Sequence, residues 1–436
     1  MAKARDLLGI NSRSSEYLRL NSHRARRTAD SKWLSKRFFI KKKIPTPKLL
    51  GMLANTREIE DFDWSSLGVG FVVKPVEGLG GEGILVIKKP AKAVGSYVMM
   101  DGSKIDVGDL KFHCRDIVQG RFSRNNLPDS ALIEERVKIH PKFLKIAVGG
   151  TPDVRVIVFN RVPVMAMLRV PTAESNGKSN LHQGAIGLGV DMATGITTYG
   201  VYRGKQIKFF PGTRDKVNGI TVPFWSKVLE TAVKIQFKLP SLGYFGCDIL
   251  IDQEKGPVVI ELNDQPGLNI QLANMAGLRR RLERVEGLEI DSVEKGVKVS
   301  RALFAAKFAQ RVMGALAGDK QVIGVFETVK VKPDKGKRVE VLAKIDTGAY
   351  STSIDEDLAT ELGLLKPEHV LWEKRFKSAL GVEMRKVVEI NFKMRGIKVK
   401  ARASVTKRGG LRRKMIIGRR DLKQFMLDPA LVKVRK

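Results

Sequence analysis

Glycines gather in one short segment of the chain, between two apolar runs. The segment reads FVVKPVEGLGGEGI, with Lys74 ahead of four closely spaced glycines, Gly78, Gly80, Gly81 and Gly83. Glycine lets backbone N–H groups approach phosphate oxygens closely, and a lysine on the preceding strand adds positive charge. The segment therefore indicates a phosphate-binding loop, although a glycine-rich turn beside a solvated lysine would have the same pattern.

Three oxygen-bearing side chains lie on two consecutive apolar runs further along the chain. Asp248 is in YFGCDILID, and Glu261 and Asn263 are in PVVIELN, with the turn residues QEKG between the two runs. If the runs are neighbouring strands, the three side chains come together. Such hard oxygen ligands suit Mg²⁺ or Mn²⁺ bridging the phosphates of a nucleotide. The alternative is that Asp248 is only a hydrogen-bonded carboxylate in a strand.

A third candidate is Asp346, which ends the apolar run VEVLAKID and is followed by Thr347 and Gly348. About 70 residues later KMIIGRRDL gives a second apolar run ending in glycine. Asp-Thr-Gly is by itself a common turn. Asp355, Asp357 and His369 could instead indicate a metal, but their spacing matches no standard site.

The elements that must position these residues are recognisable from hydrophobic patterning. A helix is expected over 31–43, stopped by Pro45 and Pro47, and another over 223–239. Strands are expected at 71–75, 84–89, 131–139, 153–160, 161–170, 244–252 and 257–263. This mixture predicts an α/β (α+β) domain. After about residue 320 the runs are short and β-branched, which predicts a small all-β domain.

A chain of 436 residues is long enough for two to three domains. We expect a basic N-terminal segment at 1–30, an α/β domain at 31–285, a basic helical connector at 286–319 and a β domain at 320–436.

The chain is strongly basic, since 79 Lys and Arg against 46 Asp and Glu give a formal net charge of +33. Such an excess attracts polyanions. Nucleic acid, ATP, anionic lipid and an acidic peptide all satisfy it, so charge alone does not choose the partner.

Cysteine usage and hydropathy indicate the compartment. The two cysteines, Cys114 and Cys247, lie far apart and form no CxxC motif, so neither a zinc site nor a disulfide framework is indicated. The N-terminus lacks an apolar run long enough for a signal peptide, and nowhere do about 18 apolar residues run together. A reducing, cytoplasmic location without membrane insertion is the expectation.

The motifs FVVKPVEGLGGEGI, IEERV, DVRV, KSNLHQGA, FGCDIL and VIELNDQPGL, in this order, resemble the ATP-grasp fold. More narrowly they resemble the RimK-related α-L-glutamate ligases, over about residues 5 to 290. One departure is plain: a typical member carries a Rossmann-like domain before its first conserved helix, whereas about 30 residues precede Lys32 here. The acceptor site is therefore left unassigned.

The resemblance implies a role for each matching residue. Lys32 and Lys74 would contact the ATP phosphates beneath the glycine loop. The others would act as follows: Glu135 and Val137 at the adenine hinge, Asp153 and Arg155 as the DxR pair, Arg169 and Lys178 as cations near the reacting phosphate, Asn180 in the SNL motif, and Asp248, Glu261 and Asn263 as metal ligands.

The activity that the resemblance implies is ADP-forming ligation of a carboxylate to an amine. A carboxylate attacks the γ-phosphorus of ATP, and an amine displaces phosphate from the acylphosphate, with Mg²⁺ or Mn²⁺ and cationic side chains stabilising the charge. Glutamate or a similar acidic amino acid would be added to a peptide or protein acceptor, in one or several cycles. The basic surface would hold an oligoglutamate product. The alternatives are a ribosome- or nucleic-acid-binding protein on this scaffold, and a ligase for another amino acid.

Residues 320–436, with Asp346-Thr347-Gly348 and IIGRRDL, resemble the retropepsin fold, in particular the RimB-type proteins associated with RimK-like ligases. Aspartic proteolysis needs two carboxylates that share a proton. Because the chain has one Asp-Thr-Gly, a catalytic site would need Asp346 from each of two chains in a homodimer. Such a domain could trim the ligation product. A non-catalytic β domain or a peptide-binding domain is the alternative.

Overall fold

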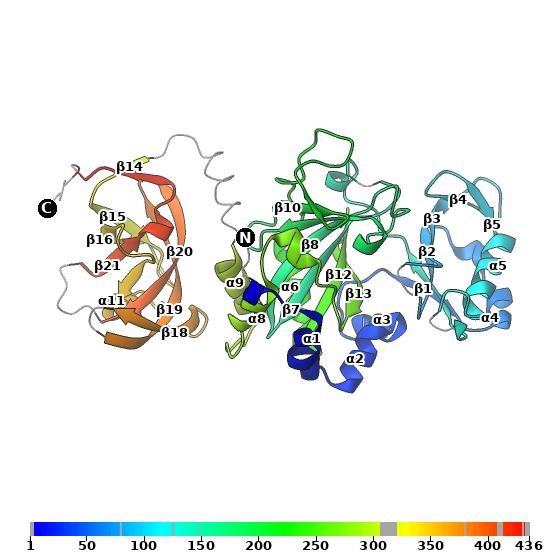
Figure 1. Cartoon of the computed structure of the whole chain (residues 1–436), viewed down its shortest axis with the longest axis horizontal. Helices are drawn as coiled ribbons and strands as arrows, with labels where there is room; N and C mark the ends of the chain where they lie inside the picture. The colour runs from blue at the N-terminus through cyan, green and yellow to red at the C-terminus, as the bar shows by residue number, and fades with distance from the viewer. Residues whose placement is uncertain are drawn as a thin grey trace. The chain divides into compact units, whose positions relative to one another are not determined.

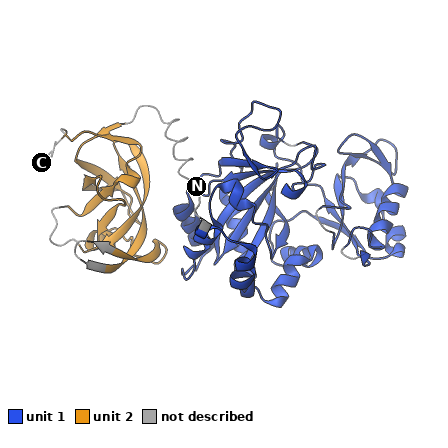
Figure 2. Cartoon of the chain, in the orientation of Figure 1, with its two compact units in different colours: residues 1–306 blue, residues 307–436 orange. Residues whose placement is uncertain are grey.

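The computed structural model describes residues 4–78, 81–123, 126–146, 148–305, 321–378, 381–407, 413–429 and 431. The chain divides into two compact units, Met1–Ala306 and Lys307–Lys436, which Figure 2 colours separately. Each unit is described by itself.

Unit 1 begins with a series of short helices, labelled in Figure 1. They are η1 (Ala4–Asp6), α1 (Ile10–Ser12), η2 (Arg13–Tyr17), η3 (Leu18–Leu20), α2 (His23–Asp30) and α3 (Lys32–Lys41). Ser22 and Ser31 cap α2 and α3, since each side-chain oxygen accepts a hydrogen bond from the backbone N–H three residues later. The helix predicted at 31–43 is thus confirmed as α3, which ends ahead of the two prolines.

These helices pack against the rest of unit 1. The Asn21 carboxamide donates to the Tyr244 carbonyl (2.7 Å) and accepts from the Tyr244 N–H (2.9 Å). The Gln271 carboxamide accepts from the backbone N–H of Leu8 at 2.9 Å. The boundary expected after residue 30 therefore does not separate compact units, because buried hydrogen bonds tie the N-terminal helices to the domain that follows.

A six-stranded antiparallel sheet forms one part of unit 1, in the order β1-β6-β2-β3-β4-β5. Its strands are β1 (Leu49–Leu53), β2 (Phe71–Pro75), β3 (Leu85–Pro90), β4 (Ser96–Met99), β5 (Lys104–Asp106) and β6 (Ala131–Glu135). The accompanying helices are α4 (Thr56–Asp61), η4 (Trp64–Ser66) and α5 (Val107–Val118). Phe71, Ile117 and Ile133 are fully buried in the core between sheet and helices. The predicted strand–glycine loop–strand pattern is confirmed, since β2 and β3 are antiparallel neighbours.

A seven-stranded antiparallel sheet forms the other part, in the order β11-β10-β9-β8-β7-β12-β13. Its strands are β7 (Asp153–Phe159), β8 (Val162–Val170), β9 (Ile186–Val190), β10 (Thr197–Tyr202), β11 (Lys205–Ile207), β12 (Tyr244–Asp252) and β13 (Gly256–Asn263). The helices α6 (Trp225–Lys238) and α9 (Val293–Phe304) pack on it and on each other. The short elements η6 (Pro141–Phe143), η7 (Leu181–Gln183), α7 (Ile270–Asn274) and α8 (Leu278–Glu283) complete the unit. All nine residues of β8 are buried, which explains why its sequence is apolar except for Arg169.

Helix α3 lies between the two sheets (Figure 1). It packs against β13 of the larger sheet, and its Lys36 reaches Glu134 on β6 of the smaller one at 2.6 Å. The motifs carried by the two sheets therefore meet around α3.

The connector expected at 286–319 is described up to residue 305, and only Val293–Phe304 of this part is helical, because residues 286–292 form turns and irregular structure. Its helix is α9, which packs on β8 and therefore belongs to unit 1. Residues 306–320 lie outside the described part of the chain.

Unit 2 is built mostly from strands, in agreement with the predicted β domain. A seven-stranded sheet runs β15-β16-β21-β17-β20-β19-β18, and an additional pairing of β15 with β19 closes it; β14 pairs with β22. The bounds are β14 (Gln321–Ile323), β15 (Phe326–Val331), β16 (Val339–Asp346), β17 (Ser353–Asp355), α11 (Glu356–Glu361), β18 (Val370–Ser378), β19 (Gly381–Met394), β20 (Ile397–Thr406), β21 (Met415–Gly418), η8 (Arg419–Asp421) and β22 (Phe425–Leu427). Ile354, Ile390 and Ile417 are fully buried in its core.

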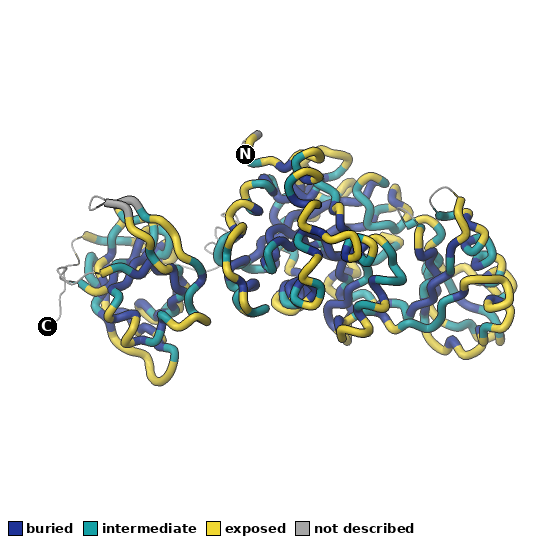
Figure 3. Tube along the Cα trace, turned by 90° about the horizontal axis from the view of Figure 1, so that it is seen from below, coloured by how far each residue is buried: buried dark blue, intermediate teal, exposed yellow. Residues whose placement is uncertain are grey.

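Burial follows this architecture: the central strands β7, β8 and β12 are mostly buried, whereas the edge strands β5 and β11 are largely exposed. Figure 3 shows buried and exposed residues along the whole chain. Among the helices of the described residues, we find none with the length and apolarity needed to cross a membrane.

Candidate active site

The register of the seven-stranded sheet brings the predicted acidic and basic residues onto neighbouring positions. Asp153 on β7 lies opposite Arg169 on β8. Arg155, two residues further along β7, lies opposite Asp248 on β12, which in turn lies opposite Glu261 on β13. Directly opposite residues share one face of a sheet, and so do residues two apart on a strand. The prediction that Asp248 and Glu261 lie side by side is confirmed.

A network of paired charges connects these strands. The Arg155 guanidinium donates two hydrogen bonds to the Asp248 carboxylate, both at 2.7 Å. The Arg169 guanidinium donates two to Asp153, at 2.6 and 2.5 Å, and a third to Asp248 at 2.8 Å. These two carboxylates and two guanidiniums neutralise one another. Glu261 adds a further negative charge beside the network, and this charge acts on Lys32 and Arg169.

Burial and charge set the protonation of Asp248, whose side chain is 1% exposed. Burial raises the pKa of Asp248, but Arg155 and Arg169 outweigh it and lower the pKa to about 2. The carboxylate is therefore ionised at neutral pH and holds both guanidiniums in fixed positions.

The oxygen ligands proposed for a metal differ in availability. Both Asp248 oxygens accept hydrogen bonds from arginines, and the Asn263 amide nitrogen is 3.4 Å from one of them. Glu261 and Asn263 are half-buried at the end of β13. Carboxylate and carboxamide oxygens are ligands that Mg²⁺ uses together with substrate phosphates and water. The donor set thus fits Mg²⁺, with Glu261 and Asn263 as the accessible ligands and Asp248 behind them.

Lys74 lies in a second charged group, beneath the glycine loop. Its ammonium binds Glu134 at 2.7 Å, and the same carboxylate binds Lys36 at 2.6 Å. Lys36 also donates to the Thr46 hydroxyl and the Pro47 carbonyl. Burial lowers the pKa of Lys36 to about 8, partly opposed by Glu134. The sequence interpretation missed Glu134 and Lys36, although the motif IEERV and the lysine-rich helix contain them.

Lys32 and the glycine loop are in contact. The Lys32 ammonium donates to the carbonyls of Gly78 (2.6 Å) and Val76 (3.2 Å). Burial lowers the pKa of Lys32, and Glu261 opposes this effect, which places Lys32 near the predicted metal ligands. Lys32 therefore interacts with both the predicted phosphate loop and the predicted metal ligand Glu261.

The other glycines of the loop follow Gly78, which accepts the hydrogen bond from Lys32. Gly81 has φ = 80°, and a Cβ atom there would lie 3.3 Å from Lys178 Cδ, so Lys178 extends along the loop. Gly83 has φ = 69° and its carbonyl is 2.9 Å from His113 Nε2. Gly80 lies outside the described residues.

Glu135 and Val137, expected at an adenine hinge, follow β6. The Glu135 N–H donates to the Lys48 carbonyl at 2.9 Å, and its carboxylate binds Lys255 at 2.6 Å. Val137 is 9% exposed. Because the Glu135 N–H already has a backbone partner, it is not available to a base edge; the hinge role of these residues stays a prediction.

Asn180 has a clear structural role. Its side-chain oxygen accepts from the His182 N–H at 3.0 Å, and its carbonyl accepts from the N–H groups of Gln183 and Ala185. Asn180 therefore shapes the turn into β9 as a capping residue. A catalytic role for Asn180 stays a prediction.

Asp346 belongs to unit 2, at the end of β16. One carboxylate oxygen accepts from the N–H groups of Gly348 (3.0 Å) and Ala349 (3.1 Å). Asp346 pairs with Gly418 of β21 in parallel register, so the two glycine-ended runs of the sequence do meet. The metal site considered for Asp355, Asp357 and His369 has other contacts at two of its residues. The Asp355 side chain caps α11, and His369 Nε2 lies 2.8 Å from the Asp334 carboxylate.

Comparison with known proteins gives one family. The model of the sugar-transfer associated ATP-grasp family matches residues 12–287. This match confirms the ATP-grasp fold predicted from the sequence. No curated protein matches the chain.

Three solved structures illustrate the range of similarity. The ATP-grasp ligase PsnB, complexed with its minimal precursor, is 15% identical, with 60% of each chain covered and a TM-score of 0.31. D-Alanine-D-alanine ligase from Helicobacter pylori is 15% identical, with 61% of this chain and 62% of that chain covered and a TM-score of 0.33. The Simian Foamy Virus (mac) protease is 20% identical, with 22% and 90% covered and a TM-score of 0.17. The chain thus covers about three fifths of the length of either ligase.

Proposed function

Because this chain belongs to the sugar-transfer associated ATP-grasp family, we propose that it is an ADP-forming carboxylate–amine ligase. Its substrates are glutamate or a similar acidic amino acid and a peptide or protein acceptor, as the resemblance to RimK-related ligases implies. The observation that supports this most is the arrangement around Lys32, which donates a hydrogen bond to the glycine loop and interacts electrostatically with Glu261.

The side chains of the candidate site would have different roles in such a reaction. ATP with Mg²⁺ supplies the phosphoryl group, and Glu261 and Asn263 would hold the metal. Lys32 and Lys178 lie along the loop that would cover the phosphates. Asp248 holds Arg155 and Arg169 in place, so the guanidinium N–H groups that these ion pairs leave unused would not need to reorganise during the reaction.

The chemistry balances with these groups alone. A substrate carboxylate oxygen attacks the γ-phosphorus, the bond to the β-phosphate oxygen breaks, and ADP leaves. The amine of the second substrate then attacks the acyl carbon, phosphate leaves with the bonding electrons, and the amine loses a proton. Hydrogen bonds from the unused guanidinium N–H groups would stabilise the transferring phosphoryl group.

The test is ADP release with labelled glutamate and a panel of acceptors, comparing the wild-type protein with Glu261→Gln. We expect the variant to lose about 10²–10³-fold in rate, as for single electrostatic groups in other enzymes. Glu230→Gln, an exchange of the same kind in α6, serves as the matched control. Wild-type protein that forms neither ADP nor amide product with any acceptor would contradict the ligase assignment.

For unit 2 we propose a retropepsin-like peptidase half-site that trims the ligation product. The support is the meeting of Asp346 with Gly418 and the two backbone N–H groups that orient its carboxylate. Activity would require a homodimer, since each chain contributes one aspartate. Release of glutamate from oligoglutamate, measured together with the oligomeric state, tests it.

Binding of a polyanion is the second candidate function, and the net charge of +33 favours it. RNA or ribosome binding that weakens steeply with salt, without ATP turnover, would support this function over ligation.

A further inference from the structure

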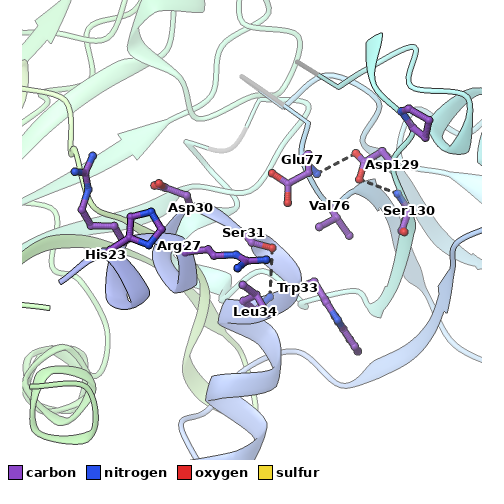
Figure 4. Close-up of a pocket in the computed structure, with 12 residues that line it drawn as sticks. His23, Arg27, Asp30, Ser31, Trp33, Leu34, Val76, Glu77, Asp129 and Ser130 are labelled. Carbon is purple, nitrogen blue, oxygen red and sulfur yellow. Dashed lines mark hydrogen bonds between the residues drawn. The ribbon is translucent and has the colours of Figure 1, made fainter. Parts of the chain in front are cut away.

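One face of α2 lines a cavity of about 790 Å³. His23, Arg26, Arg27 and Asp30 all contribute to the lining, and they are spaced three, one and three residues apart. Residues at such spacings share one side of a helix. Ser31, Trp33 and Leu34 continue the wall at the start of α3 (Figure 4).

The opposite wall comes from the small sheet and the loop before β6. Val76, Glu77, Pro128, Asp129 and Ser130 line it (Figure 4). Asp129 is 8% exposed, and its carboxylate accepts from the backbone N–H groups of Glu77 (2.9 Å) and Ser130 (2.7 Å). These bonds fix the backbone of the wall, while the Glu77 side chain is exposed.

The cavity adjoins the candidate active site on two sides. Val76 belongs to both, because its carbonyl accepts from Lys32. On the α2 side, Arg26 binds Asp264 at 2.9 Å, and Asp264 directly follows the predicted metal ligand Asn263. A molecule in the cavity would therefore lie next to the place where the acylphosphate forms.

The charged groups of the cavity fall into two classes. Arg26 and Asp30 both interact with Asp264, and Asp129 accepts from two backbone N–H groups. Among the described residues, neither the Arg27 guanidinium nor the Glu77 carboxylate has a hydrogen-bond or ion-pair partner, although both line the cavity. Within the described part of the chain, the Arg27 guanidinium on one wall and the Glu77 carboxylate on the other thus have no direct partner (Figure 4). This arrangement is complementary to a small molecule that carries both charges.

We propose that this cavity binds the amine substrate as a free α-amino acid, with its carboxylate on Arg27 and its ammonium on Glu77. The inference rests on the proposed ligase function and adds where that substrate binds.

Calorimetric titration of L-glutamate into the full chain, saturated with Mg²⁺ and a non-hydrolysable ATP analogue, tests the proposal. We expect Arg27→Gln and Glu77→Gln each to weaken binding about 10-fold or more, the usual worth of a charge-assisted hydrogen bond. Arg24→Gln is the matched control, because Arg24 is exposed on the same helix and does not line the cavity; we expect a change below about twofold.

A second probe, glutarate, lacks the ammonium group. We expect its binding to depend on Arg27 and not on Glu77. The proposal is overturned if the wild-type protein does not bind L-glutamate, if neither variant weakens binding, or if Arg24→Gln weakens it equally. Failure of the ligase function is distinguishable: binding of L-glutamate with the expected variant pattern but without ADP formation would reject ligation and keep the site. Turnover by Arg27→Gln with an unchanged KM for glutamate would reject the binding site and keep the ligase function.

Discussion

Replacement of Glu134 by Gln should destabilise unit 1 far more than replacement of the adjacent Lys36 by Met. Glu134 is the shared counter-charge of Lys36 and Lys74, at 2.6 and 2.7 Å, and the three side chains are 4%, 2% and 10% exposed. Glutamine keeps the size but removes the charge, so two buried ammonium groups lose their anion. Breaking a buried ion pair in this way costs about 3–5 kcal/mol.

The Lys36→Met variant removes a charge that the fold disfavours. Burial lowers the pKa of Lys36 from 10.5 to about 8, which corresponds to about 3 kcal/mol against the charged form. Glu134 keeps Lys74 as its partner in this variant. The Thr46 hydroxyl and the Pro47 carbonyl each lose a donor, at about 1 kcal/mol each. Gain and loss offset, so we expect stability within about 1 kcal/mol of wild type.

Urea unfolding followed by tryptophan fluorescence measures both variants, since Trp64 is buried in the core of the six-stranded sheet. The pH dependence provides a second readout. Between pH 8 and 10.5 the unfolded chain binds more protons at Lys36 than the folded chain does, so wild-type stability should rise with pH in this window. Lys36→Met should flatten that rise. A Glu134→Gln protein as stable as wild type, or a Lys36→Met protein as unstable as Glu134→Gln, would refute the reasoning.

Three further changes test other parts of the molecule. Asp248→Asn should destabilise unit 1 by about 3–5 kcal/mol in urea unfolding, since two guanidiniums lose their buried anion; a midpoint equal to wild type would contradict this. Gly81→Ala should raise the KM for ATP, because φ = 80° costs alanine about 1–2 kcal/mol, whereas Gly68→Ala, with open space around its Cβ, should leave this KM unchanged; equal effects of the two would argue against a special loop conformation. Asp346→Asn should abolish peptide cleavage and leave ADP release unchanged, since Asp346 belongs to the other compact unit; parallel loss of both in a folded variant would show that the units act together.

Much of the fold follows from local sequence. Apolar runs of strand length and the prolines after α3 predict elements such as α3, α6, β2, β7 and β12 to within a few residues, because these signals act over one or two turns of chain. The order of motifs predicts the ATP-grasp fold, which the family match confirms. The juxtaposition of Asp248 and Glu261 also follows, since a short turn joins their strands.

The packing of distant segments decided what the sequence left open. Asp248 is in the predicted place, but Arg155, 93 residues away, and Arg169 occupy both of its oxygens. Glu134, rather than Glu135, meets Lys74, because alternate residues of a strand point to opposite faces.

The sequence by itself determined which residues could bind phosphate and metal, because glycine conformation and ligand chemistry belong to individual residues. Only the tertiary structure decided which charges neutralise one another, and that α2 faces Glu77 across a cavity. Those relations depend on how α3 fits between the two sheets, a contact between segments that no local pattern records.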